Sequence, residues 1–149
     1  MMQNLKILNN KEIKKILAMI ETQWGFPEKM DYAFLETEKG KIYIANKEIF
    51  NLDLSKIRIN SVGIYFAETR AGIRLSLEGS QVIGPNATKN VVELDDKEAK
   101  QWMRGEDLDK KTDCRDFVII KYKNDFLGTG KQTKEGKILN FVPKIRRLG

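Results

Sequence analysis

Acidic side chains beside a lysine are the first residues of this sequence that could do chemistry. Glu36, Glu38 and Lys39 stand close together in the sequence. A metal-dependent nuclease needs at least two carboxylates that converge on a metal ion, with a lysine beside them. Helix-capping and turn roles account for most acidic residues of the chain, so this arrangement favours a nuclease only weakly. Histidine is absent and Cys114 is the single cysteine, which excludes an intramolecular disulfide, a Cys/His zinc site and an imidazole-based triad. We expect no catalytic residue and no metal site.

A glycine-rich segment, Gly128-Thr129-Gly130-Lys131, is the second candidate for chemistry because it resembles a phosphate-binding loop. Such a loop has a glycine where Asp125 stands, and a Ser or Thr follows its lysine where this chain has Gln132. The segment is therefore not predicted to bind a nucleotide, and no cofactor is expected. We interpret its two glycines as positions where a strand bends or another segment comes close.

Positive charge is the remaining chemical signal, and it is concentrated at the C-terminal end. The chain has 149 residues and a formal net charge of +6. Residues 108–149 contain eleven Lys or Arg and five Asp or Glu, so they carry all of this net charge, and residues 1–107 are neutral. A folded surface with clustered cations meets polyanions. RNA is the polyanion that we expect.

The cations expected to contact RNA come from one turn, the C-terminus, a short helix and the loop after that helix, and they are predicted to approach one side of a small barrel. They are Lys131, Lys134, Lys137, Lys144, Arg146, Arg147, Lys110, Lys111, Arg115, Lys100 and Arg104. Lysine and arginine contact phosphates, and arginine also stacks on bases. A solvated charged surface is the alternative interpretation. Among the aromatic residues Phe126, Phe141 and Trp102, core-facing spacing favours packing over base stacking, with Phe141 as the expected exception.

The first half of the chain is predicted to combine one helix with antiparallel strands. Apolar residues recur at helical spacing from Ile13 to Ile20, after two asparagines that can cap a helix and before Gly25, which can end it. Residues 32–45 predict a hairpin, and further strands are expected at 63–67 and at 73–78, where apolar and polar residues alternate. A linker is expected at residues 84–88 because Gly84 and Pro85 interrupt the apolar pattern.

The second half is predicted to form a small barrel with one short helix. Residues 91–94 predict a strand, and Asp95 with Glu98 marks the start of a helix that ends at Gly105. Strands are expected at 117–122, 126–132 and 137–142, where Pro143 closes the last one. The fold class is thus α+β, with a domain at 1–88 and a second at 89–149.

The sequence resembles two RNA-associated families. Residues 90–108 and the strands from DFVIIKYKN onward resemble a PUA-type domain, and more narrowly FLGTGK and the tail NFVPKIRRL are similar to the PUA-like tail of fmu/Sun-type rRNA cytosine-5 methyltransferases. The segments DYAFLETEKGKIYIANKEIF and INSVGIYFAETRAGIRLSLEG resemble the pre-PUA domain of the Nip-seven type ribosome-assembly factors. No cofactor loop and no Pro-Cys or Thr-Cys nucleophile motif accompanies them. The resemblance implies RNA binding, with rRNA as the partner and the barrel as the contacting module.

Three functions follow from these observations. The favoured one is a non-catalytic RNA-binding protein of ribosome biogenesis or rRNA modification. The second is an RNA-binding subunit that works in trans with a separate rRNA or tRNA methyltransferase, and the third is the nuclease. A ribosome-assembly or methyltransferase protein is the partner expected for the neutral N-terminal domain. No signal peptide or apolar span is recognised, so a cytoplasmic protein without membrane contact is expected.

Overall fold

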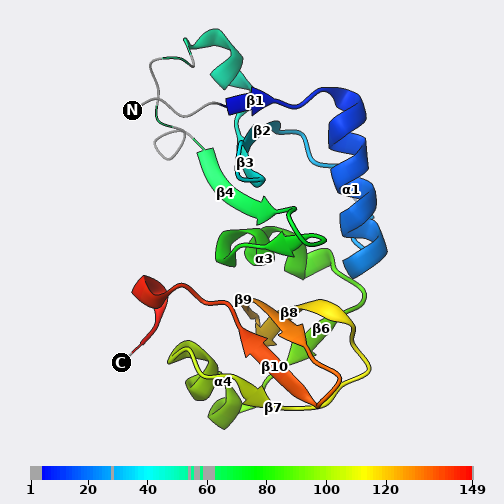
Figure 1. Ribbon diagram of the computed structural model, residues 1–149, viewed down its shortest axis with the longest axis vertical. Helices are drawn as coiled ribbons and strands as arrows, with labels where there is room; N and C mark the ends of the chain where they lie inside the picture. Colours follow the sequence, from blue (N-terminus) through cyan, green and yellow to red (C-terminus); the bar gives the residue numbers. More distant parts are fainter. Residues whose placement is uncertain (1–4, 28, 54, 56–57, 59–62, 149) are drawn as a thin grey trace.

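Two five-stranded sheets, one above the other in Figure 1, form the framework of the protein in a computed structural model that describes residues 5–27, 29–53, 55, 58 and 63–148. The upper sheet comes from the first half of the chain and the lower sheet from the second half. The fold is α+β, as predicted. None of the helices that the structure describes is long and apolar enough to cross a bilayer.

The upper sheet is an antiparallel meander of strands β1 to β5 in sequence order. Its strands are β1 (Leu5–Ile7), β2 (Ala33–Thr37), β3 (Lys41–Ala45), β4 (Gly63–Glu68) and β5 (Arg74–Leu75). The predicted hairpin is confirmed, since β2 and β3 pair antiparallel around a turn at residues 38–40. A 3-10 helix, η1 (Lys47–Asn51), follows β3 and places Ile49 in a small second core.

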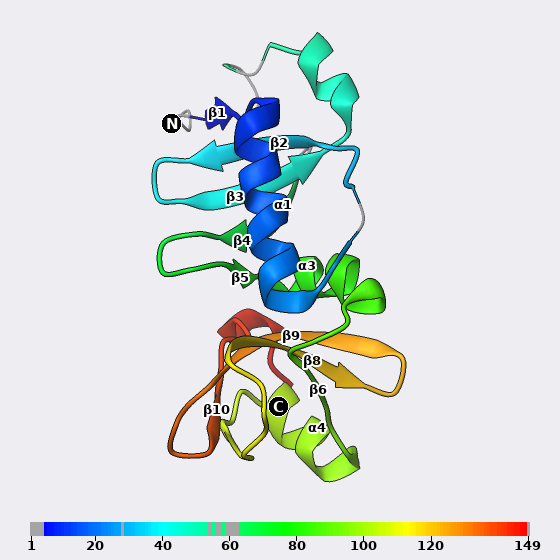
Figure 2. The same ribbon diagram turned by 90° about the vertical axis from the view of Figure 1, so that its right-hand side faces the viewer.

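Helix α1 (Asn10–Trp24) lies across one face of the upper sheet (Figure 2). Asn9 caps it by accepting a hydrogen bond from the Glu12 amide, and Glu12 reciprocates on the Asn9 amide. Its buried residues Ile16, Ile20 and Trp24 recur every four positions and pack against the sheet. The helix ends at Gly25, where φ is +67°. The predicted helix is thus confirmed.

Residues 77–83 form a helix, so the strand predicted over residues 73–78 is wrong beyond Leu75. Ser76 ends the strand and caps α3 (Leu77–Ile83), because its Oγ accepts a hydrogen bond from the Gly79 amide at 2.9 Å. A Cβ at Gly79 would lie 2.1 Å from the Phe66 carbonyl oxygen, so the helix backbone lies directly against β4. Seven residues form a marginal helix by themselves, and contact with the sheet therefore stabilises α3.

The lower sheet is curled into a half-barrel with strand order β6-β8-β9-β10-β7. Its elements are β6 (Val91–Glu93), α4 (Asp96–Met103), β7 (Leu108–Asp109), β8 (Asp116–Tyr122), β9 (Asp125–Gln132), β10 (Lys137–Asn140) and η4 (Lys144–Arg146). Strand β6 pairs parallel to β8, and the other pairs are antiparallel. The last strand ends at Asn140 and not at Val142, because the Asn140 side chain accepts a hydrogen bond from the Val142 amide and turns the chain.

One hydrophobic cluster reaches from the upper sheet to the outer face of the lower sheet, and the lower sheet has a further core of its own around Trp102. Ile119 of β8 is fully buried in the same cluster as Trp24 and Ile83, and the Phe126 ring occupies the space that a Cβ at Gly84 would need. The Trp24 indole N–H donates to the Phe117 carbonyl at 3.1 Å. The residues predicted as a linker, 84–88, therefore begin in the core. Whether residues 1–88 and 89–149 fold as independent domains stays a prediction.

Candidate nucleic-acid interface

The eleven cations predicted to approach one side of the barrel lie in two groups. In Figure 1 the loop around residues 110–115 lies to the right of the lower sheet, and η4 lies to its left. By chain segment, the loop group comprises the cations of the 110–115 loop, of β9, of β10 and of the turn between these strands, namely Lys110, Lys111, Arg115, Lys131, Lys134 and Lys137, and the terminal group comprises those of α4 and the C-terminal segment, namely Lys100, Arg104, Lys144, Arg146 and Arg147. In this view the lower sheet lies between the loop and η4, whereas Lys110 of the loop pairs with Glu98 of α4, so a face shared by all eleven cations stays a prediction.

Three cations of the loop group, Lys111, Arg115 and Lys134, line a hollow of about 460 Å³ that is formed by residues 111–116 and 132–134. Gln132 holds the loop in place, because its amide nitrogen donates to the carbonyls of Lys110 at 3.0 Å and Lys137 at 3.1 Å. Its amide oxygen accepts a hydrogen bond from the Thr112 hydroxyl at 2.6 Å. Gln132, the residue that distinguished this segment from a nucleotide-binding loop, thus orders the loop that presents Lys111 and Arg115.

The terminal group is anchored to the end of α4. The Leu148 amide donates to the Met103 carbonyl at 2.7 Å, and the Arg147 Nε donates to the Val142 carbonyl at 3.0 Å. Arg147 packs over Gly105, where an added Cβ would lie 2.3 Å from the Arg147 Cδ. Gly105 has a φ of +91°, a conformation that favours glycine. The C-terminal residues of the terminal group are therefore fixed against the end of α4.

Four of the eleven cations are paired with carboxylates. The pairs are Lys110 with Glu98 at 3.0 Å, Arg146 with Glu78 at 2.5 Å, Arg104 with Glu106 at 3.6 Å and Lys137 with Asp109 at 3.9 Å. Within the described part of the chain, the other seven have no carboxylate oxygen within 4.0 Å. These seven are Lys100, Lys111, Arg115, Lys131, Lys134, Lys144 and Arg147. They are the predicted site residues whose charge is best placed to meet a phosphate.

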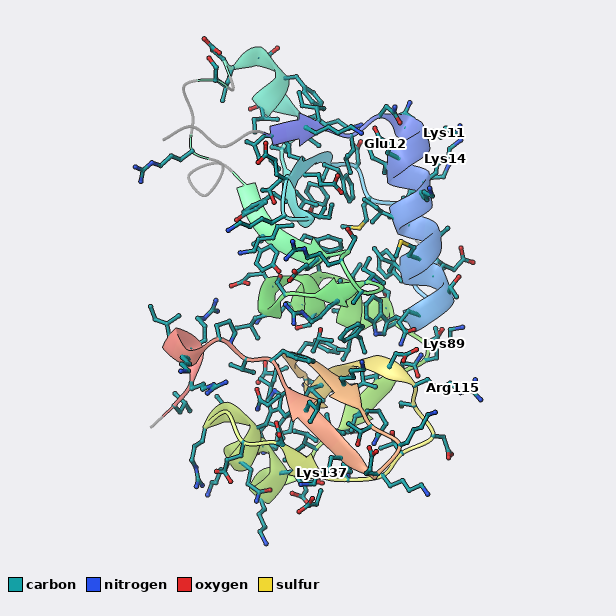
Figure 3. All side chains as sticks on the ribbon, in the orientation of Figure 1. Lys11, Glu12, Lys14, Lys89, Arg115 and Lys137 are labelled. Carbon is teal, nitrogen blue, oxygen red and sulfur yellow. The ribbon has the colours of Figure 1, made fainter. Side chains whose placement is uncertain are left out.

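Cations of the first half extend the loop group along one edge of the molecule, which the sequence did not predict. Figure 3 shows Lys11 and Lys14 on α1 above Lys89 and Arg115 on the same edge. Lys89 passes 3.6 Å from the position of a Cβ at Gly25, and the Gln23 side chain donates to the Arg115 carbonyl at 2.7 Å, so both lie at the C-terminal end of α1. Because residues 1–107 have no net charge, the charge balance did not indicate cations along this edge. Its signal was the exposed lysine stripe of an amphipathic helix.

A groove of about 520 Å³ opens where the two sheets meet. Strands β3 and β4 contribute Tyr43 and Tyr65, whose ring centroids lie 5.6 Å apart. Arg74 of β5 places its Cζ 4.8 Å from the ring centroid of Phe141, which follows β10. Burial, and secondarily the nearby Glu68 carboxylate, raises the pKa of Tyr65.

Two of the three aromatic residues weighed for base stacking lie in the core. Trp102 is fully buried and donates its indole N–H to the Leu127 carbonyl at 2.8 Å. Phe126 packs against Gly84 in the shared core. Phe141 is 36% exposed and lines the groove, which agrees with its being the expected exception.

Most of the acidic residues near the lower sheet have structural partners. Asp95 caps α4, and Glu98 completes the capping box and pairs with Lys110. Asp96 accepts a hydrogen bond from the Tyr122 hydroxyl at 2.5 Å, and this bond together with Lys123 and Lys100 lowers the pKa of its carboxyl. Within residues 5–148, apart from the gaps given above, no group of three or more His, Cys, Asp or Glu side chains is arranged to hold a metal ion.

Comparisons with known proteins relate the lower sheet to a PUA domain found in methyltransferases. Residues 89–148 match the family model described as the methyltransferase RsmF PUA domain. Over 142 residues the chain is 30% identical to the ribosomal RNA small subunit methyltransferase F of Aeromonas salmonicida (strain A449), an alignment that covers 90% of this chain and 28% of that protein.

Two further relatives carry the same name. Identity is 28% over 123 residues with the protein of Aeromonas hydrophila subsp. hydrophila, covering 77% of this chain and 26% of the relative. Identity is 31% over 93 residues with the protein of Vibrio cholerae serotype O1 (strain M66-2), an alignment that covers 61% of this chain and 20% of the relative. The chain thus spans about a quarter of the length of these relatives. The resemblance to a methyltransferase PUA domain is confirmed, whereas that to the Nip-seven type factors stays a prediction.

Proposed function

We propose that this chain, whose residues 89–148 carry a PUA domain of the RsmF type, binds ribosomal RNA in the setting of rRNA modification and contributes binding rather than catalysis. One observation carries the proposal: seven cations of this part have no carboxylate partner among the residues that the structure describes, and Gln132, α4 and the strands support the segments that carry them. Cations on ordered supports meet phosphates without first losing side-chain and loop freedom.

Both groups of cations are proposed as RNA contacts. Figure 1 shows the 110–115 loop and η4 on opposite sides of the lower sheet, so one RNA segment that reaches both must extend across the domain. The loop group continues into Lys89 and α1, which offers a longer path than the terminal group. We therefore expect the loop group to contribute more phosphate contacts than the terminal group.

Salt dependence of RNA affinity tests this function. If about five phosphates are contacted, the slope of log affinity against log salt on single-stranded RNA is about −3.5, since each contact contributes about −0.7. Replacing Lys111, Arg115 and Lys134 by alanine should reduce the slope by about 2. Replacing Lys144, Arg146 and Arg147 should reduce it less.

A control separates these effects from a simple change in net charge. Lys29, Lys39 and Lys47 are exposed on the upper half, and their replacement by alanine removes the same charge. The control variant should keep the wild-type slope. RNA binding that is absent in the wild type, or slopes that fall equally in all three variants, would contradict the proposal.

The second candidate function is binding in trans with a separate methyltransferase, which is favoured by the methyltransferase names of the relatives. In that case the chain should lower the KM of an rRNA methyltransferase that lacks a PUA domain. The loop-group variant should remove the effect. A KM that does not respond to the chain would leave RNA binding alone as the proposed function.

A further inference from the structure

We infer that the groove between the two sheets holds one unstacked base of a single-stranded RNA. This inference rests on the proposed RNA binding and adds a second kind of contact, to a base rather than to a phosphate. The groove draws on both halves of the chain, so the upper sheet takes part in recognition. Its volume of about 520 Å³ lies within the range typical of small-ligand sites.

The walls of the groove offer aromatic and guanidinium groups. Tyr43 and Tyr65 form a tilted pair on one wall, with an angle of 41° between their rings. Phe141 and Arg74 line the groove as a second stacked pair. Phe141 also contacts the Phe117 ring, with centroids 6.0 Å apart, which supports it from the lower sheet. Unstacked bases are recognised by stacking on aromatic rings and on arginine planes.

The groove is lined by a buried hydroxyl without a partner. Thr129 of β9 is 3% exposed, and its Oγ1 has no hydrogen-bond partner among the described residues. Buried side-chain hydroxyls usually have a partner, because an unpaired one costs free energy. A base presents donors and acceptors at its edge, and because the Thr129 Oγ1 has almost no accessible surface, a base can bond to it only when the neighbouring side chains shift on binding.

Charge pairing within the groove favours a neutral ring over a phosphate. Arg74 pairs with Glu68 at 2.7 Å and Arg146 pairs with Glu78 at 2.5 Å, so each guanidinium is compensated. Lys144 has no carboxylate partner within the described part of the chain, and its neighbour Ile145 lines the groove. The adjoining phosphates are therefore expected to meet the terminal group while the base enters the groove.

Two RNA probes of equal charge test this inference. One is a single-stranded RNA of about ten nucleotides, and the other is the same ribose-phosphate chain without bases. The wild type should bind the RNA more tightly than the abasic chain. Phe141→Leu removes the ring but keeps apolar bulk, and it should weaken binding of the RNA by roughly 5- to 100-fold while leaving abasic binding and the salt slope unchanged.

Matched variants guard against loss of the fold. Phe50 is 51% exposed on η1 and does not line the groove, so Phe50→Leu should bind both probes like the wild type. Thr129→Val keeps the shape of the buried side chain and should weaken binding of the RNA by roughly fivefold, the value of one hydrogen bond. Thermal melting of each variant confirms that it is folded.

The outcomes separate this inference from the proposed function. If the wild type binds the RNA and the abasic chain equally, or if Phe141→Leu and Thr129→Val behave like Phe50→Leu, the groove is not a base site although RNA binding stands. In that case a protein partner becomes the candidate occupant. If the wild type binds neither probe, the proposed function and the groove assignment both fail.

Discussion

Ser80 makes the buried polar contact between α3 and β9, and its replacement tests how firmly the two sheets are joined. Its Oγ accepts a hydrogen bond from the Gly128 amide at 3.0 Å and donates to the Leu77 carbonyl at 2.6 Å. Ser80 is fully buried. In Ser80→Ala the Gly128 amide loses its acceptor in a place that water does not reach.

The magnitude follows from two opposing effects. A buried amide left without an acceptor costs about 1–3 kcal/mol of unfolding free energy. Alanine has a higher helix propensity than serine, which offsets about 0.5 kcal/mol of that loss in α3. The net loss is therefore about 0.5–2.5 kcal/mol. For a chain of this size each kcal/mol lowers the Tm by about 2–4 °C, so the expected decrease is about 1–10 °C.

Urea unfolding followed by tryptophan fluorescence measures the change, because Trp24 reports the shared core and Trp102 the lower sheet. The control is Thr129→Val, which also removes a buried hydroxyl, but one without a partner. Losing an unpaired hydroxyl should leave stability unchanged or raise it by up to about 1 kcal/mol. The comparison therefore separates hydrogen bonding from packing.

Two results would refute this reasoning. One is a Ser80→Ala variant as stable as the wild type, which would mean that the Gly128 amide finds another acceptor. The other is an equal loss of stability in Ser80→Ala and Thr129→Val, which would mean that packing and not hydrogen bonding decides. Separate transitions for the two tryptophans in Ser80→Ala alone would further show that this contact couples the sheets.

Three more predictions concern the packing, capping and charge of the fold. Gly84→Ala should cost about 1–3 kcal/mol in urea unfolding, because its Cβ would lie 2.2 Å from the Phe126 ring; unchanged stability would contradict the packing of the two halves. Asn9→Ala should cost about 1 kcal/mol by removing the cap of α1, whereas Asn9→Ser should restore most of it. Because its pKa is lowered in the folded protein, the Asp96 carboxylate stabilises the fold at a pH above its unfolded pKa of about 4. This stabilisation is lost as the pH falls through the folded pKa. Tyr122→Phe should raise that pKa in an NMR titration of the Asp96 carboxyl, and an unchanged titration would show that Tyr122 is not its cause.

Local signals made much of the fold predictable. The capping pairs Asn9 with Glu12 and Asp95 with Glu98 mark the starts of α1 and α4, because a cap depends on residues three positions apart. Helix α3 escaped prediction, since apolar residues alternate through Leu75 to Leu77 as in a strand. The cap at Ser76 and the close packing of Gly79 against β4 stabilise the helix instead. The packing of Gly79 against β4 is a tertiary contact, which local sequence patterns do not indicate.

The candidate interface shows the same division. The sequence located the positive charge in residues 108–149, and Phe141 was the expected exposed aromatic residue. The separation of the cations into two groups depends on the course of the chain around the lower sheet. Lys89 and the α1 lysines lie on the same edge of the molecule as Arg115 only because the C-terminal end of α1 packs beside Arg115.

The sequence by itself determined the α+β class and the helices whose caps and apolar spacing lie within one or two turns. It also located the positive charge in the C-terminal part and showed the resemblance to RNA-associated families. Only the tertiary structure decided the parallel pairing of β6 with β8, the apolar cluster between the two sheets and the groove that both Tyr65 and Phe141 line. The physical reason is range. Caps and periodicity act between residues close in the chain, whereas the groove requires two sheets, folded from distant segments, to be packed together by their common apolar core.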